Sequence, residues 1–270
     1  RNSETNQMEW SPPVDLPTME QAELYDTIVL FLDELNSAPP SVQAASYQLI
    51  LNGRIGQYEM PSNVRIVAAG NRETDRGVTF RMPAPLANRF RHINMEVNFE
   101  DWQQWAVNNN IHSEVVGYLS YAKQDLFDFD PKTSSQAFAT PRSWSYVSEI
   151  LNVPGFAEAD RKEQLVELAG AIGEGMAIKF NEHRKIASDL PNPTDILNGK
   201  VKELNSKVAK EISAKYSLVV GLAYEINEAY KEAGSVDKDM GVMLNHMIRF
   251  AFNNFEPEMV IFSLKTLMKD

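Results

Sequence analysis

The sequence contains no cysteine, which excludes disulfide bonds, thiolate metal ligands and a cysteine nucleophile. It also lacks a long apolar run, because the most continuous one, Ile28–Leu32, falls far short of the roughly 18 residues of a membrane-spanning helix. Basic residues are few: 26 Lys and Arg stand against 37 Asp and Glu, which gives a net charge of −11. An acidic chain suits neither nucleic acid nor an anionic membrane, since phosphate neutralisation needs a basic surface. These absences predict a cytoplasmic protein without a membrane segment.

The length of 270 residues is enough for one large domain or two small ones, and the apolar fraction of 43% is ordinary. The chain opens on a polar segment that does not begin with Met and has no signal-peptide pattern. We therefore expect a fragment of a longer protein.

Residues 1–98 alternate β-rich apolar runs with helical patterns, after an irregular opening over 1–20. The apolar run at 27–32 is continuous, which is typical of a strand buried on both faces of a parallel sheet. Such alternation predicts an α/β domain over 1–98. The expected elements are, in order, strand 27–32, helix 38–52, hairpin 53–61, strand 64–69, helix 83–91 and strand 93–97.

From residue 99 onward helical spacing dominates and no further strand is expected. Asp189-Leu-Pro-Asn-Pro193 interrupts the helices and is the best linker candidate. We therefore expect a helical part over 99–190 and a helical extension over 191–270. The segments with helical spacing are 101–122, the stretch after Pro141, 162–180, 201–231 and 239–252.

Polar side chains follow two of the expected strands. Asp33 and Glu34 come directly after the first, and Asn71 follows the second. The carboxyl ends of parallel strands form the edge at which open α/β sheets bind ligands. An Asp there can hold Mg²⁺, and an adjacent Glu can orient a water for attack on phosphate. Acids that end a strand can equally be solvated loop residues.

The stretch from 72 to 91 is locally basic in an otherwise acidic chain. Guanidinium groups pair bidentately with phosphoryl oxygens, so arginines after such a strand fit phosphate recognition. A solvated surface cluster explains the composition equally well. The arginines are Arg72, Arg76, Arg81, Arg89 and Arg91.

Five ordered motifs together resemble the MoxR branch of AAA+ ATPases. The resemblance is close over about residues 8–150 and loose over the helical remainder. The motifs are VLFLDELNSAPP (29–40), QAA (43–45), VAAGN (67–71), PLANRF (85–90) and TPR (140–142).

The resemblance implies a role for five residues, and ATP and Mg²⁺ as cofactors. Asp33 is expected to hold Mg²⁺ and Glu34 to polarise the attacking water, as the Walker B pair. Asn71 corresponds to sensor 1. Arg89 corresponds to the arginine finger that reaches a neighbouring subunit's nucleotide, and Arg142 corresponds to sensor 2 of the helical lid. The implied fold is a truncated AAA+ (P-loop NTPase) parallel-sheet core, an all-α lid and a helical C-terminal extension.

One family element is missing. No Gly-x-x-x-x-Gly-Lys-Ser/Thr occurs in the sequence, so the phosphate-binding loop and its lysine are not present. In the family this Walker A segment and a central strand precede Walker B, and loss of that strand exposes sheet edges and an apolar face. We therefore expect this fragment alone to be inactive and to need the missing N-terminal segment as a partner.

The leading hypothesis is an ATP hydrolase that acts as a chaperone or remodelling machine on a protein client. The resemblance implies a homo-oligomeric ring, a hexamer, and partners with a von Willebrand A domain. One alternative is a non-hydrolysing scaffold or assembly subunit with the AAA+ shape. A further alternative is a nucleic-acid motor, which the net charge of −11 disfavours.

Overall fold

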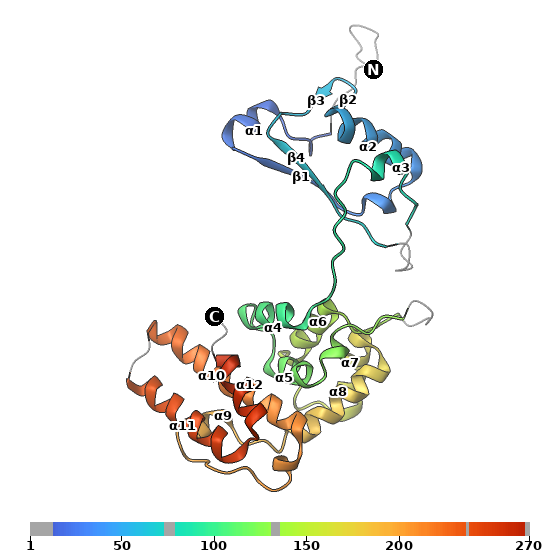
Figure 1. Ribbon diagram of the computed structural model, residues 1–270. Coiled ribbons are helices and arrows are strands. Elements are labelled where there is room, and N and C mark those ends of the chain that lie inside the picture. Colours follow the sequence, from blue (N-terminus) through green and yellow to red (C-terminus); the bar gives the residue numbers. More distant parts are fainter. Residues whose placement is uncertain (1–12, 73–78, 131–135, 236–237, 268–270) are drawn as a thin grey trace. The chain divides into compact units, whose positions relative to one another are not determined.

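The computed structural model describes residues 13–72, 79–130, 136–235 and 238–267 (Figure 1). The chain divides into two compact units, unit 1 (Arg1–Met95) and unit 2 (Glu96–Asp270). Unit 1 is mixed α/β, and the described part of unit 2 is helical apart from one isolated bridge between Asp128 and Ala139. No helix in the described ranges is long and apolar enough to cross a membrane.

Unit 1 is built on two parallel strands, β1 (Ile28–Leu32) and β4 (Val64–Ala68), in a register that pairs Ile28 with Val64 and Leu32 with Ala68. Both predicted strands are confirmed. So are the predicted helix, as α2 (Pro40–Asn52), and the predicted hairpin, as β2 (Arg54–Ile55) and β3 (Tyr58–Glu59). The remaining elements of unit 1 are short: α1 (Met19–Leu24), the 3₁₀ turn η1 (Leu35–Ser37) and α3 (Ala84–Ala87).

The prediction that the first strand is buried on both faces is wrong for the described chain. Side chains alternate along β1, so that Val29 and Phe31 are 59% and 55% exposed while their neighbours are half-buried. Val67 of β4 is paired with Phe31 and is 47% exposed on the same face. An apolar run indicates that a strand can be covered on both sides, but it does not say that a covering layer is present.

The predicted third strand at 93–97 is also wrong. This segment pairs with no strand in the described part of the chain, and Ile93 and Met95 are 74% and 88% exposed. The alternation of apolar and polar residues has the period of a strand, but a strand also requires a partner backbone. The boundary between the two units falls here, after Met95.

Unit 2 contains the longest helices of the described chain, and its helices pack into two hydrophobic clusters. The helices are α4 (Phe99–Asn108), α5 (Ser113–Tyr121), α6 (Pro141–Leu151), α7 (Arg161–Ile172), α8 (Glu174–Ala187), α9 (Pro193–Leu197), α10 (Ile212–Ala233), α11 (Lys238–Asn254) and α12 (Pro257–Leu267), with 3₁₀ turns η3 (Lys123–Leu126) and η4 (Val208–Lys210). The candidate linker 189–193 joins α8 to α9 within this unit.

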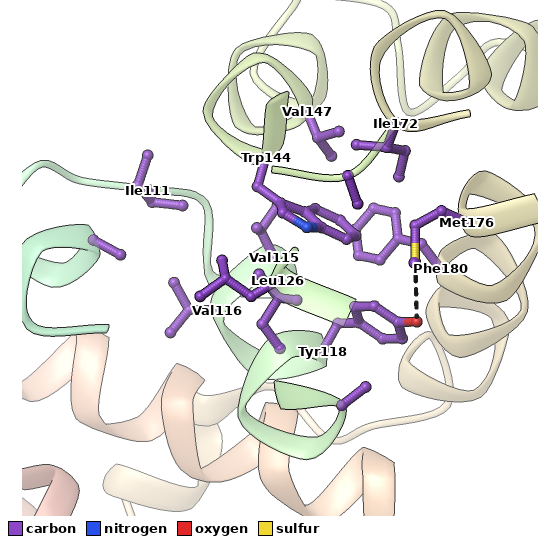
Figure 2. Close-up of a cluster of buried hydrophobic side chains, with 14 of the residues drawn as sticks. Ile111, Val115, Val116, Tyr118, Leu126, Trp144, Val147, Ile172, Met176 and Phe180 are labelled. Carbon is purple, nitrogen blue, oxygen red and sulfur yellow. Dashed lines mark hydrogen bonds between the residues drawn. The ribbon is translucent and has the colours of Figure 1, made fainter. Parts of the chain in front are cut away.

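The first cluster surrounds Trp144 of α6, which is fully buried (Figure 2). The Trp144 indole lies 5.4 Å from the Phe180 ring, edge to face, and its Nε1 donates to the carbonyl of Asp125 at 2.9 Å. The Tyr118 hydroxyl donates to the buried Asp125 carboxylate. The same hydroxyl oxygen lies 3.8 Å from the sulfur of Met176, as the dashed line in Figure 2 shows. The polar atoms of Trp144, Tyr118 and Asp125 in this core are thus hydrogen-bonded, whereas the buried Nε1 of Trp102 in the same cluster has no partner among the described residues.

Two predicted helices each divide in two because the backbone turns left-handed between them. The segment 101–122 becomes α4 and α5, separated at Asn110 with φ 55°. The segment 162–180 becomes α7 and α8, separated at Gly173 with φ 83°. A left-handed residue ends a helix, and glycine adopts it without a Cβ penalty.

Helices α5 and α10 cross closely in unit 2. A Cβ at Gly117 of α5 would lie 2.5 Å from the Ser217 hydroxyl oxygen of α10, so the small side chains set the distance between the helices. The second hydrophobic cluster contains Leu218, Val219, Leu222 and Ile226 of α10 together with residues of α9, α11 and α12.

Candidate functional site

The carboxyl ends of β1 and β4 bring two loops of unit 1 side by side. The parallel ladder continues past the strands, because Ala69 N donates to Leu32 O and Leu35 N donates to Ala69 O, each at 3.0 Å. Asp33 and Glu34 lie between these bonds on one loop, and Asn71 follows on the other. The three polar residues expected at this edge therefore belong to neighbouring loops of the same sheet.

Glu34 has an unusual backbone conformation at this edge. Its φ of 50° and ψ of 37° are left-handed, and it is one of two non-glycine residues with positive φ in the described ranges. The turn is held locally, since Glu34 N donates to Asp33 Oδ1 at 2.9 Å and Ser37 N donates to Glu34 O at 2.8 Å. The left-handed conformation costs a non-glycine residue about 1 to 2 kcal/mol, and strained residues of this kind are enriched at functional sites.

Asn36 links the two loops through its side chain. Its Nδ2 donates to the backbone carbonyl of Asn71 at 2.6 Å, and its own backbone carbonyl accepts from Phe80 N at 2.7 Å. Its Oδ1 is buried against Gly70. The sequence reasoning gave Asn36 no role, although it lies two residues after the acidic pair.

The donor set at this edge fits a magnesium ion that is completed by other ligands. Asp33 and Glu34 are both exposed, and Asp33 offers carboxylate oxygen, the ligand that Mg²⁺ prefers. No group of three or more His, Asp or Glu side chains that could hold a metal alone occurs among the residues described here. An ion held by one or two carboxylates needs waters and substrate phosphates for the rest of its shell.

Comparison of the chain with protein-family models, curated proteins and solved structures finds no match. The candidate site therefore stands on its own residues and their geometry.

The two remaining arginines of the predicted site lie on different units. Arg89 is exposed two residues after the end of α3 of unit 1, where its backbone N donates to Leu86 O at 3.0 Å. Arg142 is exposed at the start of α6 in unit 2. Both guanidinium groups are thus on the surface. Of the other arginines in the basic stretch, Arg76 lies outside the described residues.

A polar cluster that the sequence did not reveal joins α5, α7, α8 and α10 of unit 2. Arg184 Nε donates to the Glu114 carboxylate, and its Nη1 donates to Gln164 Oε1 at 3.0 Å. The His183 ring Nε2 lies 2.8 Å from the Ser217 hydroxyl oxygen. Burial lowers the pKa of His183 to about 4, with a smaller opposing effect from Glu114.

The polar side chains of this cluster hold the helices of unit 2 together, and their properties are those of structural contacts. His183 is neutral at pH 7 and only 5% exposed, and Arg184 is already bonded to two side chains. Burial also lowers the pKa of His112, the residue that caps the start of α5. The scattered histidines gave no signal for this cluster in the sequence, because its contacts form only when four helices, α5, α7, α8 and α10, meet.

Proposed function

We propose that this chain is the Walker B, sensor 1 and lid part of a MoxR-like AAA+ ATPase. The observation that carries the proposal is the edge described above, where the loop with Asp33 and Glu34 lies beside the loop with Asn71 at the carboxyl ends of two parallel strands. Phosphoryl transfer requires little besides positioning and charge stabilisation, and these side chains can supply both.

In this proposal Asp33 would hold Mg²⁺, and Glu34 would orient the attacking water and accept its proton. The water oxygen would then bond to the terminal phosphorus of ATP while the bond from that phosphorus to the ADP leaving group breaks. Asn71 places that water through its amide, and Arg142 of the lid contacts the nucleotide. Arg89 acts on the nucleotide of the next subunit in a ring of six. Hydrolysis then moves the lid against the core and remodels a protein client, in the cytoplasm, together with a von Willebrand A domain partner.

The proposal requires a phosphate-binding loop that these 270 residues do not contain. The open apolar face formed by Val29, Phe31 and Val67 supports a requirement for additional structure, since parallel strands are nearly always covered on both faces. The same missing loop favours a second candidate, a scaffold subunit that keeps the fold without hydrolysis. A nucleic-acid motor remains the least favoured candidate because of the acidic charge.

Turnover by a Glu34→Gln variant tests the proposal. The protein is produced in its source cells and purified without denaturation, so that any phosphate-loop segment joined to or associated with the chain is retained. Intact mass and peptide sequencing then identify such a segment, and ATP binding and hydrolysis are measured. We expect Glu34→Gln to bind Mg·ATP as tightly as the unmodified protein and to lose turnover by at least about a hundredfold.

The matched control is Glu23→Gln, an exposed acid on α1 of the same unit, which should hydrolyse ATP normally. Equal turnover in Glu34→Gln and the unmodified protein would rule out the Walker B assignment. Recovery of the chain without any phosphate-loop segment, and without ATP binding, would instead favour the scaffold.

A further inference from the structure

Asn36 occupies the point where three segments of unit 1 meet. Its side chain bonds the loop after β4, its backbone carbonyl accepts from Phe80, and the residue itself belongs to η1 after β1. The segments with the acidic pair and with Asn71 are also joined there by two backbone bonds, from Leu35 N to Ala69 O and from Ala69 N to Leu32 O.

The orientation of the Asn36 carboxamide follows from its neighbours. Its Nδ2 faces the Asn71 carbonyl at 2.6 Å, and the opposite orientation would place two acceptor oxygens against each other. Its Oδ1 is buried and makes no hydrogen bond within the part of the chain that the structure describes. A buried acceptor without a hydrogen bond lowers stability, so the site retains this amide at a stability cost.

Gly70 makes this arrangement possible. A Cβ at Gly70 would lie 2.3 Å from Asn36 Oδ1 and 2.8 Å from its Cγ, so any larger residue must push the carboxamide away. The backbone at Gly70 is not left-handed, which leaves close approach of Asn36 as the reason that a side chain is excluded there.

We propose that Asn36 is a positioning residue that fixes the Asn71 loop against the Asp33 and Glu34 loop, with Gly70 as the space it needs. The inference deepens the proposed function and rests on it for its catalytic consequence. Asn36 would not touch the reacting atoms. It would hold two groups that do at a set separation, and misplacement of such groups by about 1 Å can lower a rate a hundredfold.

The first test is spectroscopic and needs no nucleotide. Asn36→Ala, Gly70→Ala and the double variant are compared by NMR at the Asn71 carbonyl carbon and at the Glu34 amide. Each single change should shift both signals, because each removes the bond from Nδ2. The double variant should match Asn36→Ala, because the methyl group at residue 70 then meets no carboxamide.

The matched control is Asn63→Ala. The Asn63 amide donates to the carbonyls of Ala22 and Tyr25 at 2.9 and 2.8 Å, which is the same kind of bond at the opposite end of β4. It should lower the thermal midpoint of unit 1 and leave the Asn71 and Glu34 signals in place. An unchanged Asn71 carbonyl in Asn36→Ala, or additive shifts in the double variant, would overturn the inference.

The second test is ATP turnover by the protein purified as above. Asn36→Ala should lower kcat about tenfold to a hundredfold and leave KM for ATP within about twofold. Asn63→Ala should leave kcat unchanged. A loss of kcat that is equal in both variants would mean that Asn36 acts only through stability. If Asn36→Ala fails to fold, kcat is measured for Gly70→Ala, which keeps Asn36 but displaces its carboxamide, and the same loss of kcat is expected.

The two tests separate this inference from the proposed function. Absence of turnover in the unmodified protein would contradict the proposed function. The NMR comparison would still decide whether Asn36 fixes the two loops together.

Discussion

Lys215 and Glu256 form an ion pair in which the cation is buried and the anion is not. The Lys215 side chain of α10 is 3% exposed, and its Nζ lies 2.8 and 3.0 Å from the two carboxylate oxygens of Glu256, which is 66% exposed. Glu256 directly precedes α12, so the pair ties the start of that helix to α10. The hydrogen bond from Lys215 is the main cause that lowers the pKa of Glu256.

We expect removal of the anion to harm unit 2 more than removal of the cation. Glu256→Gln leaves a buried ammonium group without its counter-ion and should lower the free energy of unfolding by roughly 1 to 3 kcal/mol. Lys215→Met replaces the ammonium side chain with an apolar one of similar volume and should change the free energy of unfolding by less than about 1 kcal/mol. Urea denaturation at pH 7 measures both, and a larger loss in Lys215→Met would contradict this account.

The stability of unit 2 should fall as the pH drops from about 6.5 to about 4. Burial lowers the pKa of His183 to about 4, so the folded state favours the neutral ring and protonation favours unfolding. The full stabilisation is present above the unfolded pKa of about 6.5 and is lost progressively toward pH 4, by about 3 kcal/mol in total. His183→Gln should flatten this dependence in thermal melts between pH 7 and 4.

His92→Gln is the control for this pH effect, since His92 is exposed on unit 1. A residual slope is expected in His183→Gln because the pKa of the half-buried His112 is also lowered. A slope identical to that of the unmodified protein would show that His183 does not contribute.

Substitution of Gly173 and of Gly170 by alanine should change the stability of unit 2 in opposite directions. Gly173 separates α7 from α8 with φ 83°, and a Cβ there would lie 2.7 Å from the Ala137 carbonyl oxygen. Gly173→Ala should therefore destabilise unit 2 by more than about 1 kcal/mol. Gly170 lies within α7 with open space around it, so Gly170→Ala should stabilise by about 0.5 to 1 kcal/mol. Equal melting temperatures for the two variants would contradict the assignment of α7 and α8 as separate helices.

Arg89→Ala tests the ring that the proposed function requires. Since Arg89 would act on a neighbouring subunit, the variant should bind ATP normally and lose turnover by about a thousandfold in the assembled protein. The control is Arg54→Ala, which removes an exposed ion pair with Glu59 at 2.7 Å in the hairpin. Turnover by Arg89→Ala that equals the control would remove the arginine finger from the proposal.

The sequence predicted the helices and strands whose apolar residues repeat with a clear period. It did not predict element boundaries that depend on contacts with residues far away in the chain. Val201, Leu204 and Val208 have helical spacing, yet α10 begins only at Ile212. Asn254 of α11 provides the reason, because its Oδ1 accepts from Leu204 N at 2.7 Å and its Nδ2 donates to Lys202 O at 2.9 Å. The side chain of Asn254 thus forms hydrogen bonds with backbone groups that would otherwise pair within a helix. The sequence pattern also did not predict α12.

The candidate site likewise contains some features that the sequence predicted and others that it did not. Asp33, Glu34 and Asn71 could be placed at one edge of a sheet because they end two strands that were visible as apolar runs. The hydrogen bond from Asn36 could not be predicted from the sequence, because its partner is 35 residues away and the close approach at Gly70 exists only after β1 and β4 have paired. Burial on both faces of β1 was over-predicted for a related reason, since covering layers are not encoded in the strand itself.

The environment of Trp144 determines what fluorescence can report about this molecule. Its indole is fully buried among aromatic rings, whereas Trp105 is 44% exposed, so emission from Trp144 should be blue-shifted and protected from acrylamide quenching. A red shift of that component follows the loss of the core around α6 and carries no information on β1 and β4. The tryptophans of the described chain, Trp102, Trp105 and Trp144, all belong to unit 2, so the amide of Glu34 is a more direct probe for unfolding of the sheet with the candidate site.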